Sequence, residues 1–232
     1  MQKKYGLIIF LTALIFQSVC NASESAPTQA EMDAWFNDDA EFRVDEVNEG
    51  KLTFLPALKS NATHKAQANN QIKILATSSQ DGWVQMSQCH RGLDAMPLVQ
   101  LIFPEYTLRD LRITKQKGIA EAVVEAQSIQ MADISHGAEL CVTMQIKALA
   151  KNKQGQYVLT NGPYQRRFLD GYYPMKLELN VDYSQSGLRP VAIAPPQQPG
   201  MEMTDENQKM KLNVYFEGVL RTQISFDSSK QS

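Results

Sequence analysis

The feature of this sequence that most restricts its fold is a repeated alternation of apolar and polar residues. In the clearest case, the alternating apolar positions are Leu140, Val142, Met144, Ile146 and Ala148. Side chains two positions apart point to the same face of a β-strand. The pattern therefore predicts a strand with one face in a core and the other face wholly or partly in solvent.

Similar patterns recur along the chain and predict further strands. The candidate strands are residues 42–46, 72–76, 82–88, 98–103, 108–114, 177–183 and 209–226. Gly218 either turns the last of these into a hairpin or introduces a bulge. Predicted turns between strands are Asp81-Gly82, Lys117-Gly118, His136-Gly137, Asn161-Gly162-Pro163 and Asp170-Gly171. Many short strands at this spacing favour a mainly β fold, either an antiparallel β-sandwich or an open barrel.

Two segments fit this scheme less clearly. Residues 118–134 are rich in the helix formers Ala, Glu and Gln. We favour a strand there, because a turn at Lys117-Gly118 would fold the segment back on the preceding strand as a hairpin. Residues 187–208 contain four prolines, which cannot donate to a sheet ladder, so we expect an extended surface connection.

The N-terminal residues have the layout of a secretory signal peptide. Lys3 and Lys4 precede an apolar run from Leu7 to Phe16, and small polar residues follow up to Ala22. We therefore expect residues 1–22 to be a signal peptide, and the mature protein to be periplasmic or secreted. A transmembrane helix needs about 20 apolar residues, so we expect no transmembrane segment in the mature chain.

Cys20 raises the alternative of a lipoprotein anchor. Lipidation requires an aliphatic residue three positions before the cysteine and a small residue directly before it, and Gln17 and Val19 stand there instead. Cleavage after Ala22 without acylation is therefore the favoured interpretation.

The rest of the chain is interpreted as a single β-rich domain at residues 29–226. Residues 23–28 are expected to form a flexible leader, and residues 227–232 a flexible tail. Thr28 and Glu31 have the spacing of a capping box, and Trp35 and Phe36 follow on one helical face. A short amphipathic helix is therefore predicted at residues 29–37.

Two cysteines, Cys89 and Cys141, remain after removal of the signal peptide. In an exported protein an isolated pair most simply forms a disulfide. The alternative is a zinc or copper site, because His90 adjoins Cys89 and His136 precedes Cys141 by five residues. The spacing matches no established zinc pattern, so the disulfide is favoured, and neither a metal nor another cofactor is assigned.

The charge of the mature chain argues against nucleic acid as a partner. Loss of Lys3 and Lys4 leaves 21 basic and 25 acidic side chains, a net charge of −4. Nucleic-acid binding requires clustered positive charge. A protein or another component of the cell envelope is the expected partner, and the oligomeric state is not assigned.

One stretch stands out as a candidate binding site because aromatic and cationic residues are crowded together in it. Its members are Tyr164, Arg166, Arg167, Phe168, Asp170, Tyr172 and Tyr173. Such side chains are typical of binding surfaces for a sugar, an anionic headgroup or a protein. The structural alternative, which we favour, is a loop made rigid by Arg–Tyr stacking with Asp170 as the carboxylate partner of arginine.

No catalytic signature is present: the sequence has no Gly-x-Ser-x-Gly elbow, zinc helix or phosphate-binding loop. We therefore assign no catalytic residue, and predict an exported binding or assembly module of the bacterial cell envelope. The first alternative is an envelope hydrolase with a site assembled around His90, Asp94 and Asp170. The second alternative is a periplasmic zinc- or copper-binding protein.

Overall fold

β-Strands make up most of the chain that the structure describes. A computed structural model describes residues 50–56, 66–103, 107–168 and 170–229, which lie in a unit that begins at Asp45. The predicted signal peptide, leader, helix at 29–37 and strand at 42–46 lie outside the described residues. None of the described helical residues forms a segment long and apolar enough to span a membrane.

The described elements are strands apart from one helical turn, α2 (Ser78–Asp81). The strands are β1 (Thr53–Phe54), β2 (Gln67–Lys73), β3 (Trp83–Leu93), β4 (Met96–Ile102), β5 (Leu108–Glu125), β6 (Ser128–Lys147), β7 (Leu149–Lys151), β8 (Tyr157–Tyr164), β9 (Arg166–Phe168), β10 (Gly171–Tyr173), β11 (Met175–Asp182), β12 (Leu188–Ala194), β13 (Met201–Glu206), β14 (Lys209–Glu217) and β15 (Leu220–Ser228).

The strands form two large sheets and one small hairpin. The first sheet has nine strands in the order β1-β14-β11-β2-β3-β6-β4, with β13 paired to β14 and β5 paired to β6. The second has the order β12-β15-β8-β7, and β9 pairs with β10. All described pairs are antiparallel except β11 with β2. The prediction of a mainly β fold with antiparallel sheets is confirmed, and none of these sheets closes into a barrel.

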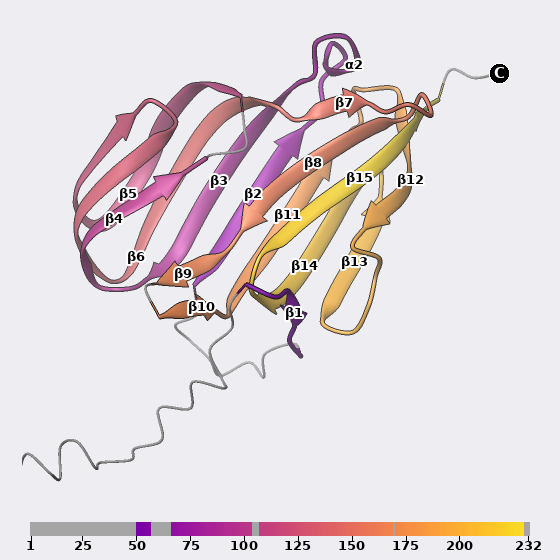
Figure 1. Cartoon of the computed structure of the whole chain (residues 1–232). Coiled ribbons are helices and arrows are strands. Elements are labelled where there is room, and N and C mark those ends of the chain that lie inside the picture. Colours follow the sequence, from indigo (N-terminus) through magenta and orange to yellow (C-terminus); the bar gives the residue numbers. More distant parts are fainter. Residues whose placement is uncertain (1–49, 57–65, 104–106, 169, 230–232) are drawn as a thin grey trace, which may run out of the picture. The chain divides into compact units, whose positions relative to one another are not determined.

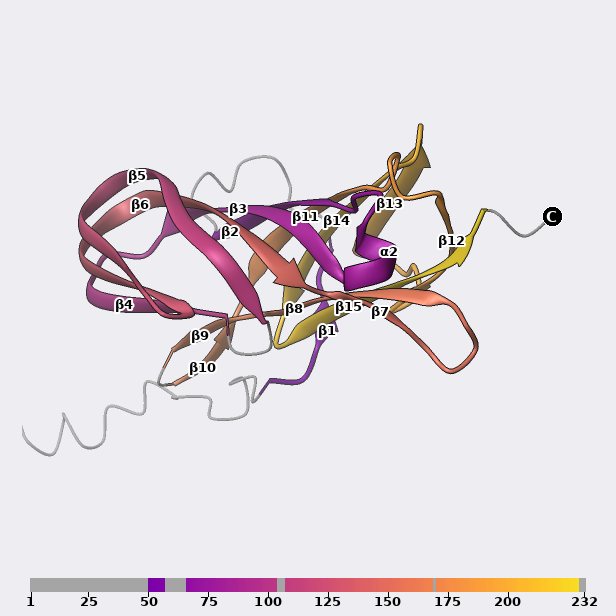
Figure 2. The ribbon, with the colours of Figure 1, turned by 90° about the horizontal axis from the view of Figure 1, so that it is seen from above.

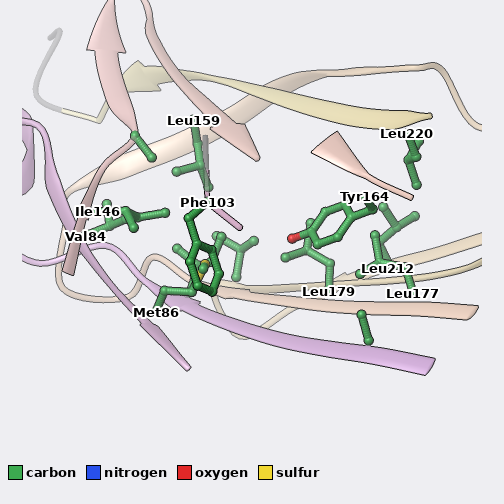
Figure 3. Close-up of a cluster of buried hydrophobic side chains, with 14 of the residues drawn as sticks. Val84, Met86, Phe103, Ile146, Leu159, Tyr164, Leu177, Leu179, Leu212 and Leu220 are labelled. Carbon is green, nitrogen blue, oxygen red and sulfur yellow. The ribbon is translucent and has the colours of Figure 1, made fainter. Parts of the chain in front are cut away.

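The two large sheets pack against each other through their apolar faces. Figures 1 and 2 show β8 and β15 crossing one face of the layer that contains β2, β3, β11 and β14. Figure 3 shows the buried side chains between them, with Leu159 and Leu220 from the four-stranded sheet and Leu177, Leu179 and Leu212 from the nine-stranded sheet. Alternation in β11, where Met175, Leu177, Leu179 and Val181 are buried in turn, explains how the sequence produces this face.

Strand β6 is long, and it bends the end of the nine-stranded sheet. Residues 128–134 of β6 pair with β4, residues 138–147 pair with β3 on the same edge, and β5 follows the opposite edge. The register shifts between Lys117 and Ile119 in β5, and Gly137 in β6 has a φ of 77°. Such irregularities bend strands, and Figure 2 shows β4, β5 and β6 curving round at this end.

The hairpin predicted at Lys117-Gly118 is wrong, although the strand prediction for residues 118–134 is correct in type. β5 continues through Gly118 to Glu125, and the chain turns at Ala126 and Gln127 instead. His136-Gly137 likewise lies within β6, and Gly162-Pro163 lies within β8. Glycine at a positive φ serves a bulge as well as a turn, so the local sequence alone does not separate the two.

The surface connection predicted for residues 187–208 is also wrong in part. It contains β12, which pairs with β15, and β13, which pairs with β14. Proline is tolerated because β12 is an edge strand and its register shifts between Pro190 and Ala192. The predicted flexible tail begins too early, because β15 extends to Ser228.

The disulfide prediction is confirmed. Cys89 of β3 and Cys141 of β6 lie directly opposite each other in the ladder and are bonded, 52 residues apart in the sequence. The bond links the two strands next to the bend. It lies on the outer face, because the neighbouring positions Gln88 and Leu140 point into the core.

We expect the disulfide to contribute strongly to stability. In the chain-entropy model, closing a loop of this length stabilises the fold by about 4 kcal/mol. The free energy of unfolding, measured by urea titration, should fall by that order when the protein is reduced. A Cys89→Ala, Cys141→Ala variant should show no response to reductant, and equal midpoints for the oxidised and reduced parent protein would contradict the expectation.

Candidate functional site

A cavity of about 410 Å³ lies under the bent end of the nine-stranded sheet. Its floor comes from β2 and β3, its roof from β4 and the first half of β6, and a side wall from the end of β8 and from β9. This volume is within the range of small-molecule sites in proteins. The lining residues that the structure describes are mostly apolar.

The roof residues come from the inward face of the bend. Val99 and Leu101 of β4 alternate with outward-facing Leu98, and Met131 and Ile134 of β6 complete the apolar wall. Leu98 is 73% exposed, which shows that neighbouring positions of β4 have opposite surroundings. The roof therefore depends on both the two-residue alternation and the curvature of β6.

Three of the polar side chains that β2 and β3 contribute to the floor lie among apolar neighbours on one face of the sheet. Asn70 of β2 and Gln88 of β3 are paired directly across the ladder, and His90 lies two residues beyond Gln88 on the same face. Asn70 is 1% exposed and Gln88 is 5% exposed. They occupy positions where the alternation of β2 and β3 otherwise places Ala68, Ile72 and Met86.

Each of these three side chains has a buried atom that lacks a hydrogen-bond partner among the described residues. The atoms are Asn70 Oδ1, Gln88 Oε1 and His90 Nε2. A buried polar atom without a partner destabilises a fold by about 1–3 kcal/mol. Such groups are uncommon in native structures, and three of the six atoms of this kind among the described residues belong to the lining of this cavity.

Tyr164 connects the floor to the second sheet. Its ring is buried, and its hydroxyl forms a hydrogen bond with Asn70 Nδ2. Figure 3 shows this ring between the two sheets, with its hydroxyl directed toward the part of the core that contains Met86 and Phe103. The bond uses the amide nitrogen and leaves Asn70 Oδ1 without a partner in the described part of the chain.

An ion pair closes one side of the cavity. Arg166 Nη2 donates to both carboxylate oxygens of Asp94 at 2.8 Å, and Arg166 Nε donates to Asp94 Oδ2 at 3.1 Å. The guanidinium also stacks on two rings, with its Cζ 5.3 Å from the centre of the Phe168 ring and 5.5 Å from that of Tyr173. These contacts tie the β3–β4 turn to β9.

The structure thus separates the seven residues of the predicted binding stretch. Tyr164, Arg166, Arg167 and Phe168 line the cavity, whereas Asp170, Tyr172 and Tyr173 do not. The proposed pairing of arginine with Asp170 is wrong, because Asp94 is the partner of Arg166 and Asp170 accepts a hydrogen bond from the Tyr173 hydroxyl. That hydrogen bond raises the pKa of Tyr173.

The stacking expected for this stretch is present. Arg167 lies over the Tyr172 ring at 5.5 Å, and Phe168 and Tyr173 meet edge to face at 5.3 Å between ring centres. Asp170-Gly171 forms the predicted turn, since Phe168 pairs with Gly171 across the β9–β10 hairpin.

The groups named for a hydrolase are only partly brought together. His90 and Asp94 line the same cavity, but both oxygens of Asp94 accept hydrogen bonds from Arg166. Asp170 is bonded to Tyr173 and is absent from the lining that the structure describes. Burial lowers the pKa of His90 to about 4, so its imidazole is neutral at pH 7.

The four residues considered for a metal site are not assembled either. Cys89 and Cys141 are bonded to each other, and the acidic neighbour of their sulfur atoms is Glu139. His90 points into the core beside Leu140, and His136 is exposed within β6. Glu139 itself binds Arg91 at 2.9 Å and Lys115 at 2.6 Å, which holds its pKa below the ordinary value.

Sequence reasoning did not identify Asn70, Gln88 or the roof residues. Asn70 and Gln88 could have been noticed in the sequence, because each is a polar residue at a position where the alternation of its strand predicts an apolar one. The roof positions Val99, Leu101 and Met131 have no such signal, since their grouping depends on the curvature of β6.

Comparisons with known proteins add little to this picture. No family model matches the chain, and no curated protein matches its sequence. Among solved structures, a mutant M1 zinc metallopeptidase from Deinococcus radiodurans with a bound Tyr-Ser-Ala substrate is similar at 9% identity and a TM-score of 0.37, covering 74% of this chain and 44% of that chain. The M1 zinc metallopeptidase from the same organism gives 9% identity and 0.34, covering 77% of this chain and 43% of that chain. The chain thus spans less than half the length of these proteins, and similarities this weak support no functional inference.

We expect the ion pair at the cavity rim to stabilise the fold measurably. Asp94→Ala should lower the free energy of unfolding by about 1–2 kcal/mol, because a partly buried arginine loses a bidentate partner. The control is Arg189→Ala, which removes a pair 3.8 Å apart whose arginine is 71% exposed and should change the free energy by less than about 0.5 kcal/mol. Equal effects of the two substitutions in chemical denaturation would contradict this account.

Burial of His90 should make stability depend on pH. Its pKa is about 4 in the folded chain against 6.5 ordinarily, so the unfolded chain binds a proton first as the pH falls. The contribution to stability is complete above pH 6.5 and is lost between pH 6.5 and 4, by about 3 kcal/mol in total.

The measurement compares the unfolding free energies of the parent protein and the variant at two pH values. The stability of the parent protein relative to His90→Gln should fall by about 3 kcal/mol between pH 7 and pH 4. His136→Gln controls for removal of an exposed imidazole. A parent-to-variant difference for His90 that stays constant across this pH range would show that the imidazole is not buried.

Proposed function

We propose that the protein is an exported binding module of the bacterial cell envelope, and that it encloses a small, mainly apolar molecule in the curled end of its nine-stranded sheet. The observation that carries the proposal is the cavity under β4 and β6, with apolar walls and three buried polar atoms that have no partner among the described residues. Concave, mainly apolar sites with a few fixed polar groups are the usual form of small-molecule sites.

Two features of the sheet support binding over simple packing. Buried polar groups without partners destabilise a fold. If the cavity were only part of the core, aliphatic side chains on its floor would therefore give a more stable protein. In addition, the Arg166–Asp94 pair holds β9 beside the β3–β4 turn, so this side of the cavity has a defined wall.

Export is supported by two independent features. The N-terminal residues have the layout of a signal peptide, and Cys89 and Cys141 form a disulfide of the kind that persists in oxidising compartments. The proposed architecture is a β-sandwich in which one sheet curls at its end to make room for the ligand. A protein partner that delivers or receives the ligand is compatible with this function.

Binding can be tested with a neutral apolar dye such as N-phenyl-1-naphthylamine, whose fluorescence rises in apolar surroundings. The parent protein should bind the dye, and Val99→Phe, which fills the cavity from the roof, should weaken binding at least tenfold. Leu98→Phe is a matched control, because it adds the same ring on the exposed side of the same strand and should leave binding unchanged. Absence of dye binding to the folded parent, or equal binding by both variants, would refute the proposal.

A further inference from the structure

The polar atoms of the cavity floor define which ligand chemistry fits. Asn70 Oδ1 and Gln88 Oε1 are amide oxygens, which only accept hydrogen bonds, whereas His90 Nε2 belongs to an imidazole that carries one donor and one acceptor. Asn70 and Gln88 are at least nine-tenths buried and lie opposite each other, with His90 further along the same strand face. A ligand group that donates a hydrogen bond can therefore satisfy these amide oxygens, and it can also bond the imidazole.

Charged ligand groups are disfavoured by the same surroundings. A carboxylate only accepts hydrogen bonds, so it gains no bond from the amide oxygens of Asn70 and Gln88 and is repelled by them. Two of the three arginines in the lining are already paired with carboxylates, Arg166 with Asp94 and Arg91 with Glu139, and the third, Arg167, is exposed and stacks on Tyr172. Taking an ion into an apolar cavity without a free countercharge is strongly unfavourable.

A hydroxyl group satisfies these requirements. It can donate one hydrogen bond to an amide oxygen and accept another, so it can bridge the floor atoms of β2 and β3. The roof, made by Val99, Leu101, Met131 and Ile134, offers aliphatic contacts to the remainder of the ligand. Polar floor and apolar roof together match a molecule with one hydroxyl end and a hydrocarbon body.

We propose that the ligand of this cavity is an uncharged amphiphile with a hydroxyl group, of the class of long-chain alcohols and monoacylglycerols, bound with its hydroxyl on Asn70 and Gln88. This inference rests on the proposed function and specifies its ligand class. Gln88 is its specificity residue, because its oxygen is buried in the lining without a partner in the described part of the chain.

The test is competition with bound N-phenyl-1-naphthylamine by three probes that share a ten-carbon chain. The probes are 1-decanol, its methyl ether, which accepts but cannot donate, and decanoate, which is charged at pH 7.5. For the parent protein, 1-decanol should displace the dye at a concentration at least tenfold lower than either of the other probes. The ether comparison isolates the donated hydrogen bond, and the decanoate comparison isolates charge.

Variants locate the hydrogen bond. Gln88→Leu should retain dye binding, lose most of the preference for the alcohol over the ether, and raise the unfolding temperature, because a buried unpartnered amide is removed. Gln88→Met, with an unbranched side chain, should behave in the same way and serves as the second variant. Gln71→Leu is the matched control, since Gln71 is exposed on the opposite face of β2, and it should keep the parent preference.

The outcomes separate this inference from the function on which it rests. If the dye binds but the probes displace it equally, or if decanoate is preferred, the hydroxyl inference is overturned and the cavity remains a binding site. A preference for the alcohol that persists in both Gln88 variants also overturns it. If the folded parent binds no dye and no probe, the proposed function fails as well.

Discussion

The pairing of β6 with three other strands is the constraint on which the described structure depends. β6 joins β3, β4 and β5 into one sheet, and it bends where its partner on one edge changes from β4 to β3. The disulfide between Cys89 and Cys141 fixes the straight half of this pairing. Because β3 supplies the floor of the cavity and β4 supplies the roof, a different register of β6 would remove the cavity altogether.

The cavity places energetic demands on the rest of the fold. Polar groups on its floor replace apolar contacts that would otherwise stabilise the core, and the enclosed space forgoes the dispersion energy of close packing. The remainder of the two sheets offsets these terms with a continuous apolar interface, in which Phe216 and Phe226 are completely buried. A site that is less stable than its surroundings is a common property of binding proteins.

The sequence was sufficient to predict features that depend on local pattern. Alternation identified most strands, and the isolated cysteine pair identified the disulfide. It was insufficient where one local signal serves two geometries. Gly118 and Gly137 resemble turn residues, yet both lie inside strands at bulges, and Pro190 is accommodated because β12 is at an edge.

For the candidate site too, the sequence predicted local features but not long-range contacts. Crowding of aromatic and cationic residues between Tyr164 and Phe168 pointed to one wall of the cavity, and His90 and Asp94 were noted separately. These residues meet at one cavity because β8 crosses the face of β3, and this contact joins two sheets and segments far apart in the sequence. The pairing of Arg166 with Asp94, 72 residues away in the sequence, could not be inferred from spacing.

The central claim is that the space under β4 and β6 receives a ligand, and methionine methyl NMR tests it directly. Met86, Met96, Met131 and Met175 line the cavity, whereas Met203 lies on β13, outside its described lining. With methyl-labelled protein and 1-decanol, the account predicts intermolecular nuclear Overhauser effects to the four cavity methionines and none to Met203. Effects confined to Met203, or no effect at any methyl group at saturating alcohol, would contradict it.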